Sequence, residues 1–195
     1  MARATRILTA GLVAAMAVTA SARPAAAQDR HLTVKVRNDA NIPSDLLALA
    51  ETAVTAIYAK AGIDATFVEG PADFAVVLLS SQTADKMHQI PDAVGFAPGS
   101  ETARGHIAYV LQPRVDTIAD GYSTARWVVL AAAMAHEVGH LLMFNAHSKT
   151  GVMRAAWNQA DFSQAVRGHL LFTPEQAAQM GARLSGDAQQ LAMAR

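Results

Sequence analysis

The order of apolar and polar residues in the first half of the chain predicts several strands and one helix. Residues 31–37 alternate between apolar and polar side chains, as a half-buried strand does. Residues 74–79 form an unbroken apolar run, which is typical of a strand buried on both faces. Between them, apolar residues recur at helical spacing from Ser44, which can cap a helix, to Gly62, which can end it. Further strands are expected at residues 63–68 and 106–111, with a short edge strand at 94–97.

Helical patterns dominate the second half of the chain. Residues 123–144 predict a long helix whose central stretch carries no charge, so it should run through the middle of the domain. A weak helix is expected at residues 161–166. The last helix should begin with Thr173 as its cap and Gln176 placed for a capping box. The tail after Gly186 is expected to fray.

These elements predict a fold class. The order strand, helix, strand, strand favours a right-handed crossover that makes two strands parallel. We therefore predict an α+β fold that is α/β-like in its N-terminal part. It has a twisted mixed sheet, one backing helix, one long central helix and a C-terminal helical part. The chain shows no internal repeat and no low-complexity linker, so residues 28–195 are predicted to form a single domain.

Residues 1–27 have the layout of a secretory signal peptide. Arg3 and Arg6 give a positive start, and an uncharged apolar run of 14 residues follows. Small residues then offer cleavage after Ala27, which we prefer, or after Ala22. The run is shorter than the roughly 20 residues needed to span a bilayer. We therefore expect an exported protein, secreted or periplasmic, without a stable membrane anchor.

The mature chain has little net charge and no cysteine. Removing residues 1–27 takes away three arginines and no acidic residue, which leaves 13 basic and 16 acidic side chains and a net charge of −3. This balance gives no basic patch for nucleic acid and no polybasic segment for a membrane surface. Because cysteine is absent, disulfides and thiolate metal sites are excluded, and any metal must be held by His, Asp or Glu.

The end of the long predicted helix carries the sequence His136-Glu137-Val138-Gly139-His140. Residues four apart on a helix share a face, so the two imidazoles can bind one zinc ion. Glu137 is rotated by about 100° from His136, so it can flank the ion without binding it. There it can act as the general base that takes a proton from zinc-bound water during attack on a carbonyl. An idle carboxylate would be costly to bury in this apolar helix, which argues against a purely structural role.

A third metal ligand is expected, because a catalytic zinc ion usually has three protein ligands and a water molecule. His147 is the favoured candidate, since the chain can reverse after the helix and return this side chain to the ion. Asp161 and Glu175 are rival ligands, although Glu175 also suits the first turn of a helix. The remaining histidines lack ligand spacing and are expected to be surface or core residues: His31, His88, His106 and His169.

The motif and the segment after it resemble a known family. His136-Glu137-x-x-His140, followed by His147 and a Gly-Val-Met sequence ending at Met153, resembles the metzincin branch of zinc metallopeptidases. The third histidine follows one residue later than in the metzincin pattern. The resemblance implies a small zincin or metzincin-like domain in which the long helix is the active-site helix. It further implies three histidine ligands, Glu137 as the base and Met153 in a turn beneath the zinc. The run H-S-x-x-G-x-M-R-x-x-W is also similar to one in uncharacterised secreted bacterial proteins.

The resemblance implies a mode of substrate binding as well. An edge strand would bind an extended peptide by strand addition, and residues 94–97 or 106–111 would supply that strand. Tyr109 and Tyr122 can donate a hydrogen bond to an oxyanion, with ordinary packing as the alternative for each.

We therefore expect a secreted zinc metalloendopeptidase that acts on peptides or proteins with one catalytic Zn²⁺. Two alternatives stay open. One is a zinc hydrolase acting on a non-peptide amide. The other is a non-catalytic zinc-binding secreted protein, whose site would usually close with a fourth protein ligand. The sequence leaves the oligomeric state open.

Overall fold

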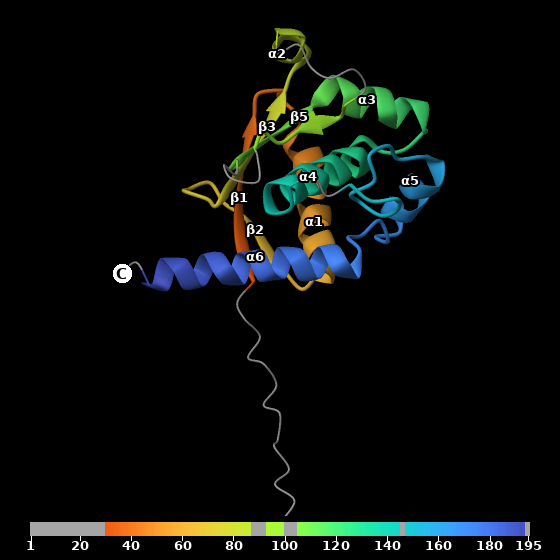
Figure 1. Ribbon diagram of the computed structural model, residues 1–195. Coiled ribbons are helices and arrows are strands. Elements are labelled where there is room, and N and C mark those ends of the chain that lie inside the picture. The colour runs from red at the N-terminus through yellow and green to blue at the C-terminus, as the bar shows by residue number, and fades with distance from the viewer. Residues whose placement is uncertain (1–29, 87–92, 100–104, 145–146, 194–195) are drawn as a thin grey trace, which may run out of the picture.

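The computed structural model describes residues 30–86, 93–99, 105–144 and 147–193 (Figure 1). The strands are β1 (His31–Asn38), β2 (Asp64–Phe67), β3 (Phe74–Leu79), β4 (Gly95–Phe96) and β5 (Ile107–Leu111). The helices are α1 (Ser44–Lys60), α2 (Ser81–Lys86), α3 (Gln112–Gly121), α4 (Arg126–Leu142), α5 (Gln159–Val166) and α6 (Pro174–Met193). The predicted signal peptide lies outside the described residues. Across those residues, no helix has both the length and the apolar character to cross a membrane.

The strands form one mixed sheet in the order β2-β1-β3-β5-β4. β1 pairs in parallel with β2 on one side and β3 on the other, and β5 continues the parallel set beside β3. β4 closes the sheet as a short antiparallel edge strand, with Phe96 opposite Tyr109. The mixed sheet and its parallel N-terminal part agree with the prediction. Of the two predicted candidates for an edge strand, only β4 lies at an edge.

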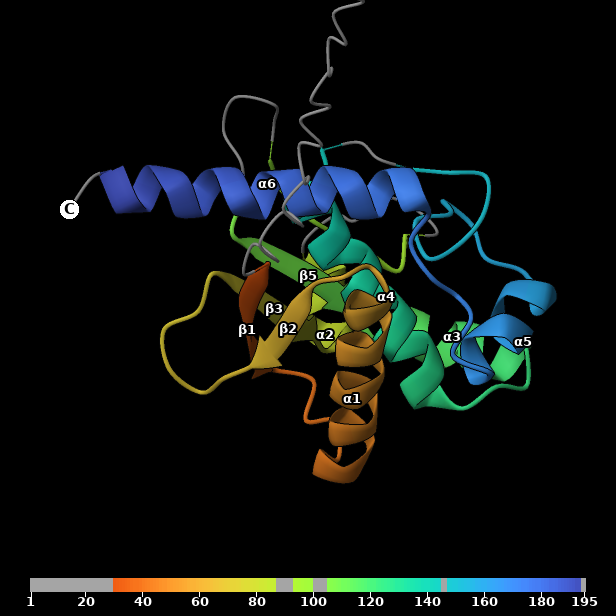
Figure 2. The ribbon, with the colours of Figure 1, turned by 90° about the horizontal axis from the view of Figure 1, so that it is seen from below.

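α1 and α4 lie side by side and pack into the core with the sheet (Figure 2). α4 occupies the centre, since 14 of its 17 residues are buried, as its uncharged sequence predicts. Tyr58 of α1 is fully buried and donates a hydrogen bond to the carbonyl of Ala135 at 3.0 Å. This bond ties α4 to α1 one residue before the first histidine of the motif. α6 runs across one end of the domain (Figures 1 and 2).

Two helices are missing from the sequence prediction. The sequence predicts one helix over residues 123–144, whereas α4 begins at Arg126 and the separate helix α3 precedes it. Pro113 lies in the first turn of α3, where a residue without an N–H is tolerated. α2 buries none of its side chains, so it leaves no apolar period in the sequence.

The predicted helix ends have mixed outcomes. Ser44 is the first residue of α1, with Pro43 at the cap position and no side-chain cap, so its predicted capping role is wrong. Gly62 follows α1 with a φ of +72°, a conformation that glycine adopts without strain. The prediction placed the end of this helix at Gly62, two residues beyond Lys60.

The C-terminal helices are longer than predicted. α5 begins at Gln159 instead of residue 161, and α6 extends to Met193, past the expected fraying point near Gly186. The start of α6 is as predicted. The N–H of Thr173 donates to Gln176 Oε1 at 2.9 Å, and the N–H of Gln176 donates to Thr173 Oγ1 at 3.3 Å.

Candidate metal centre

The last two turns of α4 carry the two histidines of the motif. Their Nε2 atoms lie 2.9 Å apart, as expected for imidazoles one helical turn apart that point at a common centre. His136 is buried, with 6% of its surface exposed, whereas His140 is partly exposed. α4 therefore supplies two candidate ligands, one buried in the protein and one partly open to solvent.

His147 completes a cluster of three histidines. Its Nε2 lies 3.1 Å from Nε2 of His140 and 3.3 Å from Nε2 of His136. The reversal begins at the helix end, where the N–H of Met143 still donates to the carbonyl of Gly139 at 2.8 Å. Within the described residues, these three histidines are the group whose ligand atoms converge closely enough to hold a metal ion. The structure thus places His147 where the sequence predicts the third ligand.

The segment that follows His147 folds back on itself. The N–H of Ser148 donates to the carbonyl of Met153 at 2.9 Å, and the N–H of Val152 donates to the carbonyl of Leu171 at 3.0 Å. Gly151 makes the turn with a φ of +77°, where a Cβ atom would also collide with the Leu171 carbonyl. These contacts fix residues 148–153 as a closed loop that begins directly after His147.

Hydrogen bonds and burial set the protonation of the two helical histidines. The carbonyl of Val152 lies 2.8 Å from Nδ1 of His136. A carbonyl can only accept, so Nδ1 carries the proton and Nε2 offers its lone pair to the cluster. Burial lowers the pKa of His136 to about 4. Burial and the two neighbouring histidines lower the pKa of His140 to about 3. Both side chains are therefore neutral at pH 7, as metal ligands must be.

The geometry of the three nitrogens fits a zinc ion. Tetrahedral coordination with Zn–N bonds of 2.0–2.1 Å places ligand nitrogens about 3.3 Å from one another. The separations of 2.9, 3.1 and 3.3 Å lie close to that value. No carboxylate joins the group within the described part of the chain, so three ligands leave one coordination position open.

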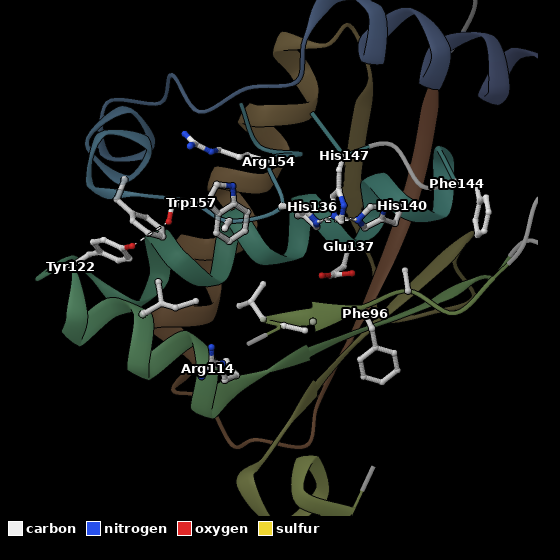
Figure 3. A pocket seen from close by; sticks show the side chains of 18 residues that line it. Phe96, Arg114, Tyr122, His136, Glu137, His140, Phe144, His147, Arg154 and Trp157 are labelled. Carbon is white, nitrogen blue, oxygen red and sulfur yellow. Dashed lines mark hydrogen bonds between the residues drawn. The ribbon is translucent and has the colours of Figure 1, made fainter. Parts of the chain in front are cut away.

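Glu137 lies beside the cluster with its carboxylate directed into the pocket (Figure 3). It is 3% exposed, and its Oε2 accepts no hydrogen bond from the described residues. Burial raises its pKa to about 8. On its other side it packs against the backbone of β4, since a Cβ atom at Gly95 would lie 2.8 Å from Glu137 Cγ. The carboxylate is thus held between α4 and the edge strand.

Met153 lies under the two histidines of α4. It is fully buried, and a Cβ atom at Gly139 would lie 2.6 Å from its sulfur and 3.1 Å from the ring of Phe172. Gly139 stands between Glu137 and His140 in the motif, so its lack of a side chain lets the methionine approach the helix closely. Met153 thus packs against the helix that carries the motif, and its role as a turn methionine stays a prediction.

A pocket of about 640 Å³ opens in front of the three histidines (Figure 3). Residues 93–97, which include β4, form one wall, and residues 154–157 form another. α3 contributes Arg114 and Ile118, the residue after it is Tyr122, and α5 contributes Phe162. The pocket is lined by both the histidine cluster and Glu137.

The rival third ligands have structural roles elsewhere. Asp161 accepts a hydrogen bond from the N–H of Asn158 at 2.9 Å as part of the capping box of α5, and it pairs with Arg154 at 3.0 Å. Glu175 lies in the first turn of α6, where hydrogen bonds with its own backbone N–H and with the Thr173 side chain lower the pKa of its carboxyl group. Neither belongs to the histidine group.

The two tyrosines that could donate to an oxyanion are engaged in packing. The hydroxyl of Tyr122 donates to the carbonyl of Trp157 at 3.2 Å, although its ring lines the pocket. Tyr109 stacks on Phe96 with ring centroids 4.7 Å apart and does not line the pocket. The packing alternative therefore describes both residues.

The other histidines lie away from the site. Nδ1 of His106 lies 3.1 Å from the carbonyl of Asp73, and its ring stacks on Phe74. His31 is in β1 and His169 follows α5, both exposed. His88 lies outside the described residues.

Sequence reasoning missed three residues that shape the site. Gly95 acts by lacking a Cβ atom, and the sequence shows the glycine but not its place beside Glu137. Val152 acts through its backbone carbonyl, which leaves no mark in residue type. Trp157 donates its indole N–H to the Val152 carbonyl at 3.1 Å. It closes the H-S-x-x-G-x-M-R-x-x-W run, which was its only sequence signal.

Comparisons with known proteins bear on the fold. No model of a protein family matches the chain, and no curated protein matches it in sequence. The crystal structure of archaemetzincin from Methanopyrus kandleri is similar, with a TM-score of 0.50 and 13% sequence identity. The likeness covers 83% of this chain and 98% of the archaemetzincin chain. The chain has an archaemetzincin-like fold. This confirms the predicted metzincin-like fold class, while at such low identity the likeness shows the fold alone.

Proposed function

We propose that the protein is an exported zinc metalloendopeptidase with His136, His140 and His147 as ligands and Glu137 as the general base. One observation carries the proposal. Three imidazole nitrogens converge beside a buried carboxylate in an open pocket. The archaemetzincin-like fold supports it. Export is proposed from the sequence of residues 1–27.

The chemistry follows from these side chains. Zinc bound at the three nitrogens would lower the pKa of water and stabilise negative charge on a substrate oxygen. In the metal-free site Glu137 is neutral at pH 7, because burial raises its pKa to about 8. A positive charge nearby favours its ionised form. Ionised Glu137 can then take a proton and later release it to the leaving amine.

The position of β4 supports a peptide as the substrate. β4 is the last strand of the sheet, and residues 93–97 line the pocket. Its inner side is occupied, since the N–H of Leu111 donates to the carbonyl of Val94 at 2.9 Å. An extended peptide could pair with the outer side and place a carbonyl beside the histidines. A small amide would not use this strand, so the strand favours the peptidase over the amidase alternative.

The role of Glu137 is tested by exchanging its carboxylate for an amide. Glu137→Gln should keep one zinc ion per chain and lower kcat on a peptide library by at least about 100-fold, since general-base catalysis contributes that much. Glu175→Gln is the matched control, because it makes the same change on an exposed helix turn. Peptide hydrolysis by Glu137→Gln at the wild-type rate would show that the base is wrong.

The third ligand is tested by metal affinity. His147→Ala should weaken zinc binding by more than about 100-fold. Loss of a group that only orients a ligand weakens metal binding by up to about 100-fold, and loss of the ligand itself should weaken it more. His169→Ala serves as the control, as it removes an exposed histidine outside the cluster. Chelator competition on the purified protein measures both. Equal affinities for His147→Ala and the wild type would remove His147 from the proposed site.

A further inference from the structure

One backbone carbonyl behind the histidine cluster accepts two hydrogen bonds. Nδ1 of His136 lies 2.8 Å from the Val152 oxygen, and Nε1 of Trp157 lies 3.1 Å from the same atom. An indole N–H can only donate and a carbonyl has two lone pairs, so both bonds can form together. The two aromatic rings thus share one acceptor, and both depend on where that acceptor lies.

Trp157 is itself held from three sides. Its ring meets His136 edge-on, with centroids 5.4 Å apart and planes at 86°. The same ring contacts Phe162 of α5, with centroids 6.0 Å apart. Its backbone carbonyl accepts a hydrogen bond from the hydroxyl of Tyr122 at 3.2 Å. Trp157 is therefore held by Tyr122, which follows α3, and by Phe162 of α5, both outside the loop that contains Val152 (Figure 3).

The Val152 carbonyl belongs to the loop that also positions His147. The loop closes through the bond from Ser148 N–H to the Met153 carbonyl. Any movement of Val152 would therefore disturb both His136, through its Nδ1–H, and the start of the loop beside His147. A donor that holds this carbonyl in place therefore helps to position two of the three candidate ligands, His136 and His147.

We infer that Trp157 is a positioning residue of the metal centre. Its indole N–H holds the Val152 carbonyl in the place where that carbonyl fixes the ring plane and the Nδ1–H tautomer of His136. The inference rests on the proposed zinc site. Groups that orient a metal-bound histidine through its second nitrogen typically change metal affinity by 10- to 100-fold when they are lost. The tryptophan at the end of the H-S-x-x-G-x-M-R-x-x-W run thereby gains a physical role.

Metal affinity provides the first test. Trp157→Phe keeps an aromatic ring against His136 and removes only the N–H donor, so zinc affinity should fall by about 10-fold. Trp127→Phe is the matched control. Trp127 lies on α4, is partly buried, and has no hydrogen bond from its indole within the described residues. Its replacement should leave zinc affinity unchanged, as measured by competition with a chelator.

The tautomer of His136 is a second measurement, and it should not change if Trp157 acts by packing alone. Nitrogen NMR of the metal-free wild type should show His136 protonated at Nδ1. Trp157→Phe should shift His136 towards a mixture of the two neutral tautomers, and Trp127→Phe should not. If Trp157→Phe does not fold, Tyr122→Phe is used instead. That variant releases the backbone of Trp157 and should move the same signals in the same direction.

The outcomes separate this inference from the proposed function. If Trp157→Phe lowers the urea midpoint but leaves both the tautomer and the zinc affinity unchanged, Trp157 acts by packing alone and the inference is overturned. If the wild type binds no zinc, the proposed function fails. The tautomer measurement on the metal-free chain still decides the role of Trp157 in that case.

Discussion

Glu137 shows how much the chemistry of a residue in this protein depends on its surroundings. In water its carboxyl group would be ionised at pH 7. In the structure it is buried against the backbone of Gly95, and burial raises its pKa to about 8. His136 and His140 change in the opposite sense, because burial penalises the charged form of either kind of group. Near pH 7 the metal-free site therefore carries little charge and many lone pairs.

These pKa shifts predict how the stability of the metal-free protein depends on pH. The folded state holds the Glu137 proton up to about pH 8, whereas the unfolded state releases it near 4.5. The stability gained from neutral Glu137 is thus complete below pH 4.5 and declines as pH rises to about 8. His136 acts oppositely, since unfolded histidine binds a proton below about 6.5 and the folded one only below about 4. His136 therefore lowers the free energy of unfolding as pH falls from about 6.5 to about 4.

Glu137→Gln isolates the carboxylate contribution. The metal-free variant should be more stable than the wild type at pH 8, by up to several kcal/mol, and the difference should vanish below pH 4.5. Urea unfolding at a series of pH values in the presence of a chelator measures this. Parallel pH profiles for the two proteins would show that Glu137 is not held neutral in the folded state.

At the scale of elements, the loop after α4 decides whether a third histidine reaches the site. α4 alone places two histidines on one face, which any helix with this spacing would do. His147 returns to them because residues 148–153 form a closed loop anchored on Leu171. The anchor lies about twenty residues further along the chain, so the loop takes its shape from the segment leading into α6. This is why spacing to His147 can differ from the metzincin pattern while the cluster remains intact.

Gly151 offers a test of that loop. Gly151→Ala introduces a Cβ at a φ of +77° and against the Leu171 carbonyl. The free energy of unfolding of this variant should fall by more than the roughly 1–2 kcal/mol that a left-handed conformation costs an ordinary residue. Its zinc affinity should fall as well. Gly168→Ala is the matched control, because Gly168 has a φ of +72° but open space around its Cβ position. Equal losses for the two variants in urea unfolding would contradict a role for the Leu171 contact.

For the whole molecule, the packing of α4 against the sheet brings together the parts of the site. β4 reaches Glu137 only because it pairs with β5, against which α4 packs. α3 and α5 supply the far wall of the pocket, and α1 fixes α4 through Tyr58. The pocket in front of the histidines therefore joins segments that are distant in the sequence, and α4 packs against several of them. Metal binding on α4 should thus stabilise the domain as a unit.

Zinc should consequently raise the stability of the whole domain. Free zinc at 1,000 times its Kd would add about 4 kcal/mol if the unfolded chain does not bind it. For a chain of this size that corresponds to a rise in Tm of roughly 10 °C. Calorimetry with zinc and with a chelator measures the shift, and His140→Ala should abolish it. A Tm that zinc leaves unchanged in the wild type would argue against a metal site in the folded protein.

The sequence alone determined much of this protein, for local reasons. Helical spacing put His136 and His140 on one face, alternation of apolar and polar residues defined β1, and apolar runs defined β3 and α4. These signals depend on neighbouring residues. The sequence prediction missed α2, which buries no side chain, and α3, although its apolar residues from Val115 to Tyr122 recur at helical spacing. It expected an edge strand at 94–97 but left 94–97 and 106–111 as alternatives for the strand that would bind a peptide. Which strand lies at an edge depends on pairing between distant segments, and pairing is a property of the sheet.

Only the tertiary structure decided how the candidate site is completed. The sequence offered His147, Asp161 and Glu175 as third ligands, and the fold placed His147 in the cluster and engaged the other two in helix ends. The Val152 carbonyl and the bare backbone at Gly95 act on the site through geometry. Val152 contributes a carbonyl that every residue possesses, and Gly95 contributes by lacking a Cβ atom. Only the folded chain shows which groups these two positions face.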